Sequence, residues 1–218
     1  MDAERFLRDL PALFRGFPHG EEPLDPRFAE VLEIVPGLAR ANNLALLNLV
    51  AKCLGPGETY VEVGAFRGTS LIGAMLDNEA VDFVAIDDFS RGDGSREQLE
   101  RNLARFGLAG RATILEGDAF ELLRSDALVD RRVGAYYYDA GHTYEEHCDG
   151  LVLAEPYLVD GALVIVDDTD WDFVDAAVRD YLDSRPNVRS VLKVGGKDTG
   201  QPWWWEGVQV LEWRAGAA

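Results

Sequence analysis

Short apolar runs alternate with helix-forming segments along most of this 218-residue chain, and this alternation limits the fold more than any other feature. The runs are four or five residues long, as strands buried in a sheet are. Five of them lie at 59–63, 82–86, 112–115, 134–138 and 162–166. The helices that follow them are expected at 69–77, 95–106, 119–125, 143–158 and 171–183. Strands joined by helices of this length form a parallel sheet with helices on both faces.

The two last apolar runs have no helix between them. They span 188–194 and 207–213, so we expect them to pair as an antiparallel hairpin at one edge of the sheet. Residues 1–37 alternate short helical stretches with breakers, and we interpret them as an N-terminal helical cap. The main domain would then span 38–218 and begin with a helix over 38–54.

Acidic residues dominate the charge of the chain. Asp and Glu outnumber Lys and Arg 39 to 21, and the net charge is −18. Phosphate backbones and anionic membrane surfaces are bound through clustered Lys and Arg, so nucleic-acid and membrane partners are disfavoured. The sequence has neither a long apolar span nor the apolar core of a signal peptide, and its two cysteines lack metal-type or disulfide spacing. We therefore expect a cytoplasmic protein with free thiols.

A glycine-containing loop follows the first predicted strand and opens the next helix. Gly64 permits a tight turn, and Gly68 lets the free amides of the helix N-terminus approach a ligand. Asp87 ends the second strand, where an acid can bind both hydroxyls of a ribose. The loop lacks the glycine spacing of dinucleotide-binding proteins, and Glu62 would repel a diphosphate while tolerating a sulfonium or a cationic amino-acid tail. The loop therefore favours S-adenosylmethionine over NAD.

The segment VEVGAFRGTS at 61–70 resembles motif I of class I S-adenosylmethionine-dependent methyltransferases. DAGHTY at 139–144 and VIVDD at 164–168 are similar to a subgroup of small-molecule O-methyltransferases of the macrocin and cephalosporin-biosynthesis kind. The resemblance, over residues 40–185, implies a Rossmann-like α/β fold with a seven-stranded, mostly parallel sheet and an antiparallel C-terminal hairpin. The cofactor-binding residues that the loop and the resemblance indicate are Glu62, Gly64, Gly68, Thr69, Ser70, Asp87, Asp88, Asp118 and Ala119.

Three acids follow the fourth and fifth predicted strands. If these strands are neighbours, Asp139 lies close to Asp167 and Asp168. Two like charges about 4 Å apart repel by roughly 4 kcal/mol at an effective dielectric constant of 20, so the cluster should hold a cation or take up a proton. All-oxygen ligands suit Mg²⁺ or Ca²⁺, and the resemblance implies a divalent metal that orients the acceptor hydroxyls. The alternative is that Asp167 is a solvated strand end and Asp168 caps the next helix.

His142 is our first candidate for the general base, because it follows Asp139 by three residues and titrates in the useful range. Asp139 is the second candidate. An alternative of equal weight is that His142 hydrogen-bonds the loop backbone and only shapes the site. We interpret His19 and His147 as ordinary surface residues.

Two aromatic clusters require a place in the fold. Tyr136, Tyr137 and Tyr138 fit a buried fourth strand whose side chains pack on both helical layers. The cluster Trp203–Trp205 should pack against the sheet edge, a subunit interface or the acceptor pocket, with packing or an interface favoured. Trp171, beside the acids, is the better candidate for lining the pocket.

These features predict an S-adenosylmethionine-dependent methyltransferase that uses Mg²⁺ to assist O-methylation of a small hydroxylated metabolite. N-methylation and several acceptor classes remain open, as does a homodimer. One alternative is an NAD-dependent oxidoreductase on a similar sheet. Another is a catalytically silent partner subunit that keeps the methyltransferase fold.

Overall fold

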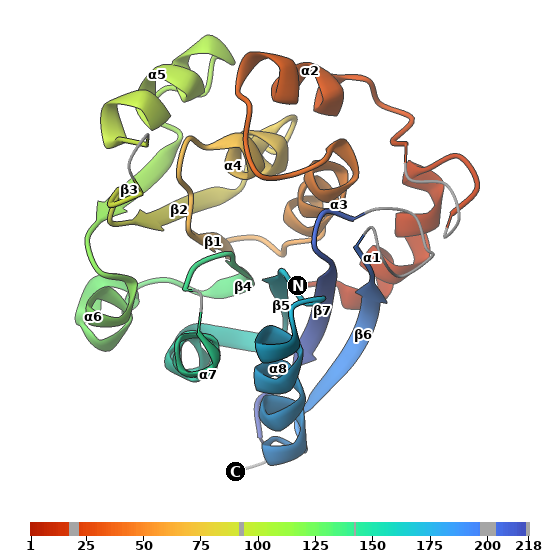
Figure 1. Ribbon diagram of the computed structural model, residues 1–218, viewed down its shortest axis with the longest axis vertical. Helices are drawn as coiled ribbons and strands as arrows, with labels where there is room; N and C mark the ends of the chain where they lie inside the picture. The colour runs from red at the N-terminus through yellow and green to blue at the C-terminus, as the bar shows by residue number, and fades with distance from the viewer. Residues whose placement is uncertain (18–21, 92–93, 142, 197–203, 217–218) are drawn as a thin grey trace.

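The computed structural model describes residues 1–17, 22–91, 94–141, 143–196 and 204–216. Within these residues a seven-stranded sheet crosses the molecule in the order β3-β2-β1-β4-β5-β7-β6 (Figure 1). The strands are β1 (Thr59–Val63), β2 (Asp82–Asp87), β3 (Ala112–Glu116), β4 (Val133–Tyr138), β5 (Leu158–Asp167), β6 (Val188–Val194) and β7 (Val208–Trp213). The first five are parallel, and β7 is antiparallel to both β5 and β6. The predicted sheet and its final hairpin are therefore confirmed.

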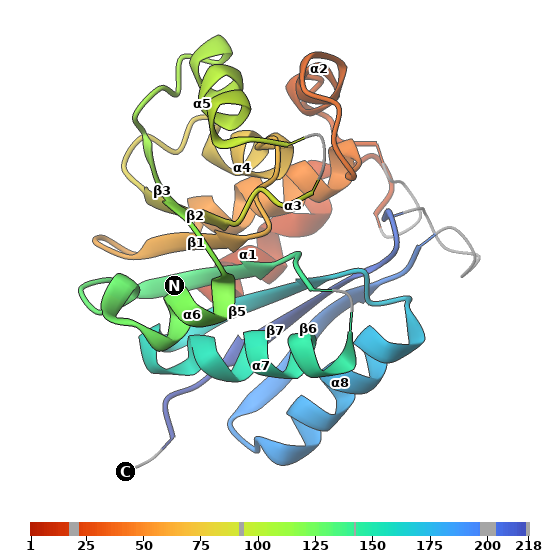
Figure 2. The same cartoon turned by 60° about the vertical axis from the view of Figure 1, so that its left-hand side comes forward.

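Helices cover both faces of the sheet (Figure 2). One layer contains α1 (Ala3–Asp9), α3 (Ala41–Lys52), α4 (Thr69–Met75) and α5 (Arg96–Arg105), with α2 (Arg27–Ile34) beside α3 and α4. The other contains α6 (Ala119–Arg124), α7 (Tyr144–Ala154) and α8 (Asp172–Ser184). Among the described residues there are also three short 3₁₀ turns, η1 (Leu10–Leu13), η2 (Asp126–Leu128) and η3 (Glu155–Tyr157). None of the helices in this described part of the chain is long and apolar enough to span a bilayer.

The seventh α-helix ends earlier than the sequence pattern predicts. We expected it to reach residue 158, but it ends at Ala154 and passes into η3. Pro156 lacks the backbone N–H that the next helical hydrogen bond requires, so the helix cannot continue through it. Strand β5 in turn begins at Leu158, four residues before the predicted start.

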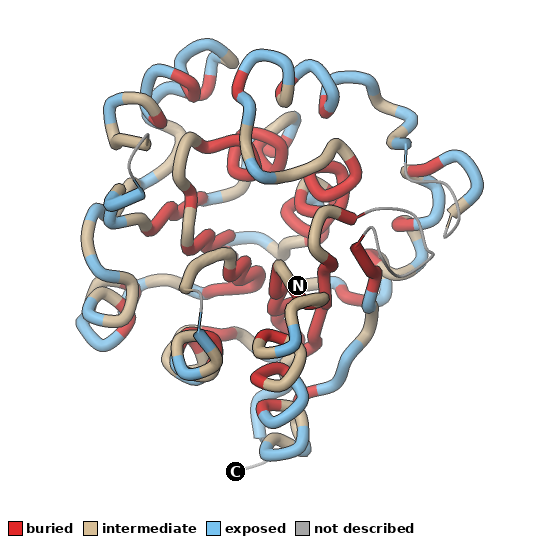
Figure 3. Tube along the Cα trace, viewed as in Figure 1, coloured by how far each residue is buried: buried red, intermediate tan, exposed pale blue. Residues whose placement is uncertain are grey.

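Strand β4 divides the core into two apolar layers. Tyr137 packs on the side of α1, α3 and α4, whereas Tyr136 and Tyr138 pack on the side of α7 and α8. All three tyrosines are buried, as predicted, because successive side chains of a strand point to opposite faces. Figure 3 shows this burial concentrated in the central strands.

The N-terminal segment joins the same core. Phe6, Leu10 and Val31 are buried in the apolar layer that also contains Tyr137. The amide of Asp2 donates to the carbonyl of Cys53, just after α3. The division of the chain into a cap over 1–37 and a main domain stays a prediction. In the structure, residues of both parts share one continuous core.

The carboxyl ends of the central strands are aligned. Val63 of β1 lies opposite Ile86 of β2 and Tyr138 of β4, and Tyr138 lies opposite Val166 of β5. The residues after these positions therefore emerge at one edge of the sheet. That edge carries the loops in which the sequence placed its candidate site residues.

Candidate functional site

The turn after β1 depends on Gly64. This residue has a left-handed backbone (φ 93°), and its amide donates to the carbonyl of Ile86. A Cβ at this position would lie 1.9 Å from the carbonyl oxygen of Asp139. A side chain is therefore excluded, and the β1 turn lies directly against the end of β4.

Glycine is needed at position 68 for a different structural reason. It precedes α4 with φ 85°, and a Cβ there would meet the side chain of Leu99 on α5 at 2.3 Å. Gly68 is therefore required for helix packing. Among the residues described, it lines neither of the two cavities at this edge of the sheet, whereas Gly64 lines both.

The two cavities lie side by side at the carboxyl ends of the strands. The first cavity, of about 180 Å³, is bordered by Ser70, Asp139, Asp168, Trp171 and Trp205 among others. The second, of about 270 Å³, is bordered by Asp87, Asp88, Asp118, Ala119 and Phe120 among others. Both are bordered by Gly64, Phe66, Arg91 and Asp139. The shared residues make one continuous site with two compartments.

Glu62 lies beneath the first cavity without lining it. Its side chain is fully buried, and it accepts hydrogen bonds from the hydroxyls of Ser70 at 2.6 Å and Tyr60 at 3.2 Å. Burial raises the pKa of Glu62 to about 7, although these two hydrogen bonds oppose the shift. Ser70 does line the cavity, together with Thr69. Glu62 is therefore linked to the first cavity through its hydrogen bond with Ser70.

Asp87 holds two loops at the entrance of the second cavity. Its two carboxylate oxygens accept hydrogen bonds from the amides of Phe66 and Phe89, each at 2.6 Å. Burial raises its pKa above the usual value, against the effect of these two bonds. Asp88 is exposed, and its carboxylate accepts the amide of Ser90. Asp87 therefore joins the glycine turn to the end of β2.

The far side of the second cavity is formed by the start of α6. Asp118 caps this helix by accepting the amide of Glu121 at 2.8 Å, and Ala119 follows it. The ring of Phe120 borders the same cavity and was not among the predicted residues. An aromatic side chain in this position supplies a flat apolar surface against which a nucleobase can pack.

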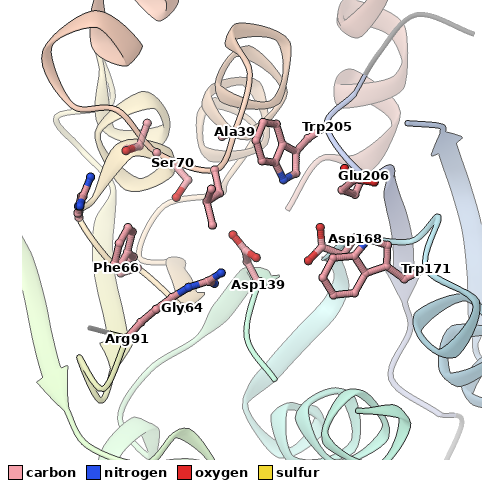
Figure 4. Close-up of a pocket in the computed structure, with 15 residues that line it drawn as sticks. Ala39, Gly64, Phe66, Ser70, Arg91, Asp139, Asp168, Trp171, Trp205 and Glu206 are labelled. Atoms are coloured by element: carbon pink, nitrogen blue, oxygen red, sulfur yellow. The ribbon is translucent and has the colours of Figure 1, made fainter. Parts of the chain in front are cut away.

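The three acids predicted to bind a metal lie close together, but they do not all face the first cavity. Asp139 and Asp168 line the first cavity, and Figure 4 shows both carboxylates directed into it. Asp167, the last residue of β5, is only 2% exposed. Asp168 has a left-handed backbone (φ 55°), which turns its side chain away from the line of the strand. The suggestion that Asp168 caps the next helix is wrong, because Trp171 is the N-cap of α8.

Burial and the charges of nearby carboxylates raise the pKa of all three acids. Burial raises the pKa of Asp139 well above its usual range, and the charges of Asp167 and Asp168 add to this effect. Burial and the charge of Asp168 raise the pKa of Asp167 to about 7. Burial and the charge of Glu206 raise the pKa of Asp168 to about 6. The cluster therefore favours a proton or a cation, as the sequence suggested.

The donor chemistry at the first cavity fits Mg²⁺ with two of these acids. Mg²⁺ is commonly held by one or two carboxylates and completes its shell with water and substrate oxygens. Asp139 and Asp168 supply such a pair. Within the described ranges, no group of three or more His, Cys, Asp or Glu side chains is arranged to hold a metal ion. The three-acid ligand set stays a prediction.

Two tryptophans form walls of the first cavity. Trp171 lines it, as predicted, and Trp205 also lines it from the connection before β7. Figure 4 shows Trp171 beside Asp168, Trp205 beside Glu206, and the guanidinium of Arg91 reaching toward Asp139. Trp204 is buried and packs edge-on against Phe14 at 5.3 Å. Trp204 thus serves packing and Trp205 borders the cavity, whereas Trp203 lies outside the described residues.

Of the two histidines that follow β4, His147 lies within the described residues and His142 does not. His142 lies outside the described residues, so its role as a base stays a prediction. The interpretation of His147 as a surface residue is wrong. It is 3% exposed, and its ring lies edge-on to Tyr138 at 5.3 Å and to Phe173 at 5.9 Å. It occupies the inward face of α7. His19 also lies outside the described residues.

Sequence reasoning missed several cavity residues because they lie in loops without a motif. Arg91 and Glu206 come from connections after β2 and before β7, where spacing gives no signal. The left-handed backbones of Phe66, Asp168 and Trp205 mark this site in the structure. Such conformations cost about 1–3 kcal/mol each and are frequent at functional sites.

A mostly parallel sheet, a glycine turn above its first strand and an acid at the end of the second define the fold of class I methyltransferases. Residues 61–169 match the family described as a methyltransferase domain, and the chain belongs to this family. No sequence among the curated proteins matches the chain.

Solved structures share the fold at low sequence identity. The O-methyltransferase TomG from Streptomyces achromogenes, involved in tomaymycin synthesis and solved with S-adenosylmethionine, is 21% identical with a TM-score of 0.65. The match covers 99% of this chain and 100% of TomG. An O-methyltransferase from Bacillus cereus, solved with S-adenosylhomocysteine, is 16% identical with a TM-score of 0.64 over 88% of this chain and 92% of that one. The chain therefore shares the fold of these two proteins over most of its length.

Proposed function

We propose that this protein transfers the methyl group of S-adenosylmethionine to a hydroxyl of a small metabolite. The observation that carries the proposal is the contact between Gly64 and the backbone of Asp139. It joins the loop typical of cofactor binding to an acidic cavity of a size suited to a small acceptor. TomG and the Bacillus cereus protein, which share the fold, are both O-methyltransferases and support this choice.

In this proposal the cofactor spans the two compartments. Its adenosine would occupy the second cavity, with the ribose at Asp87 and the base against Phe120. Its methionine part would cross Gly64 toward Ser70, so the sulfonium reaches the border of the first cavity. The acids around the first cavity favour the positive charge of the sulfonium. Asp88 and Asp118 would border the adenosine.

The acceptor would enter the first cavity between Trp171 and Trp205. Its hydroxyl oxygen would attack the methyl carbon, the bond between that carbon and sulfur would break, and S-adenosylhomocysteine would leave. The hydroxyl proton passes to a base, for which His142 is the first candidate and Asp139 the second. Two aromatic walls and an acidic floor suit a small ring that bears hydroxyls. The net charge of −18 makes a nucleic-acid acceptor unfavourable.

Magnesium is part of the proposal. A divalent ion bound by Asp139 and Asp168 would lower the pKa of an acceptor hydroxyl and fix its direction. The residues themselves position the acceptor, exclude water with the two indoles and hold the cofactor in line. Direct transfer needs this positioning more than covalent chemistry.

The test has a binding stage and a transfer stage. Calorimetry should show that the protein binds S-adenosylmethionine and S-adenosylhomocysteine, with no measurable uptake of NAD. The protein is then incubated with methyl-labelled S-adenosylmethionine and paired acceptors that carry either a free hydroxyl or the matching amine. We expect label in the hydroxyl compounds. Absence of cofactor binding by the folded protein would refute the function, and label only in amines would refute O-methylation.

A further inference from the structure

A buried tyrosine hydroxyl lies between two of the acids at the site. Tyr137 is 1% exposed, and its hydroxyl donates to Oδ2 of Asp167 at 2.5 Å. The same hydroxyl lies 3.3 Å from Oδ2 of Asp139. These residues come from adjacent strands, β4 and β5, whose ends are aligned. The phenolic proton of Tyr137 therefore lies between the carboxylates of Asp139 and Asp167, which would otherwise repel each other.

Asp167 is occupied on both of its oxygens. Oδ2 accepts the hydroxyl of Tyr137, and Oδ1 accepts the amide of Asp168 at 3.0 Å. Its side chain is buried and does not line the first cavity, whereas Asp139 and Asp168 do. In this arrangement Asp167 lies behind the pair of acids that faces the cavity.

These contacts connect Tyr137 to both acids of that pair. It reaches Asp139 directly, and it reaches the backbone of Asp168 through Asp167. The second link holds the left-handed turn at Asp168, because the backbone amide that donates to Asp167 is the amide of Asp168 itself. Loss of the hydroxyl would free the Asp167 carboxylate to rotate, and the turn at Asp168 would lose its fixed partner.

We propose that Tyr137 is a positioning residue that, with Asp167, orients the Asp139 and Asp168 carboxylates toward a divalent ion in the first cavity. This inference rests on the proposed function, of which the ion is a part. In this proposal Asp167 supports the site, and the carboxylates of Asp139 and Asp168 bind the ion directly. Residues that hydrogen-bond to metal ligands commonly change metal affinity 10- to 100-fold when they are altered.

The experiment compares Tyr137→Phe with Tyr136→Phe. Tyr136 is the neighbouring buried tyrosine, and its hydroxyl donates to the backbone carbonyl of Gly150 at 3.0 Å on the opposite face of the sheet. Both variants lose one buried hydroxyl, so they should lose similar stability. Binding of Mg²⁺ is measured by calorimetry and binding of Mn²⁺ by its electron paramagnetic resonance signal, each with and without S-adenosylhomocysteine.

We expect Tyr137→Phe to bind both ions roughly 10- to 100-fold more weakly while its affinity for S-adenosylhomocysteine stays within about threefold of wild type. Tyr136→Phe should match wild type in both measurements. Equal ion affinity in Tyr137→Phe and wild type, or equal losses in the two variants, would overturn the inference.

A second pair of variants separates support from ligation and covers the case in which Tyr137→Phe does not fold. Asp167→Asn keeps an oxygen that can accept the Tyr137 hydroxyl, so it should weaken ion binding less than Asp139→Asn does. Equal losses in these two would make Asp167 a direct ligand and overturn the inference. Wild type that binds S-adenosylhomocysteine but no divalent ion would also overturn it, with methyl transfer left standing. Absence of cofactor binding would instead refute the proposed function.

Discussion

The carbonyl oxygen of Asp139 occupies the space where a side chain at Gly64 would begin, since a Cβ there would lie 1.9 Å away. This contact joins the end of β4 to the turn after β1. It places the acid at the border of both cavities. The proposed meeting point of cofactor and acceptor depends on this close approach of two backbones.

Replacing Gly64 should therefore damage both stability and cofactor binding. We expect Gly64→Ala to lower the free energy of unfolding by more than about 2 kcal/mol, because it adds a steric clash to an unfavourable backbone conformation. Denaturant unfolding measures this change. Gly57→Ala is the control, because Gly57 has a similar φ of 72° with nothing within 4 Å of a Cβ. If the two variants lose the same stability, the contact with Asp139 has no energetic importance.

Asp87 should matter more than its neighbour Asp88 for cofactor affinity. Asp87→Ala removes two hydrogen bonds that hold Phe66 and Phe89, along with the proposed ribose contact. Each hydrogen bond to a charged group contributes about 1.5–3 kcal/mol, so we expect at least a roughly tenfold loss of affinity for S-adenosylhomocysteine. Calorimetry on Asp87→Ala and Asp88→Ala checks the order. A larger loss in Asp88→Ala would move the ribose contact to that residue.

His142 and His147 should give opposite results. His142→Ala is expected to keep cofactor binding and to lower turnover at least about tenfold once an acceptor is known, as removal of a general base does. His147→Ala should lower the unfolding temperature, because this ring packs between Tyr138 and Phe173, and leave the turnover of the folded protein near wild type. Turnover measured with labelled cofactor decides between them. Full activity in His142→Ala would leave Asp139 as the candidate base.

The raised pKa of Glu62 predicts a pH-dependent stability. Burial raises the pKa of this carboxyl from 4.5 to about 7 in the folded protein, so the folded state binds more protons than the unfolded state between these values. Stability from this group is therefore present below pH 4.5 and is lost as the pH rises to 7, by about 3 kcal/mol in total.

Glu62→Gln removes the loss of stability that accompanies rising pH, and it keeps an oxygen acceptor for the hydroxyl of Ser70. Without cofactor or metal, the variant should match wild type near pH 4.5 and be more stable at pH 8. Denaturant unfolding at pH 4.5, 6 and 8 measures the difference between the two proteins. A difference that stays constant over this range would contradict the shifted pKa.

Much of the fold was predictable from local pattern. The apolar runs, their spacing and the helices between them are properties of neighbouring residues, and the short length of each run favours a strand over a helix. The start of β5 was missed because Asp160 and Gly161 look like a turn, yet Leu158 pairs with Val133 of β4. The pairing depends on a strand 25 residues earlier in the chain, which no local pattern shows.

By itself, the sequence determined which strands exist and that their carboxyl ends carry a glycine turn and several acids. Only the tertiary structure decided which acids face the cavity. Asp167 and Asp168 are identical in type and adjacent in the chain, but the left-handed turn at Asp168 separates their side chains. The hydroxyl of Tyr137 then fixes Asp167 in the core. Side-chain direction depends on backbone dihedrals and on neighbours from other strands, and both arise only when the sheet has formed.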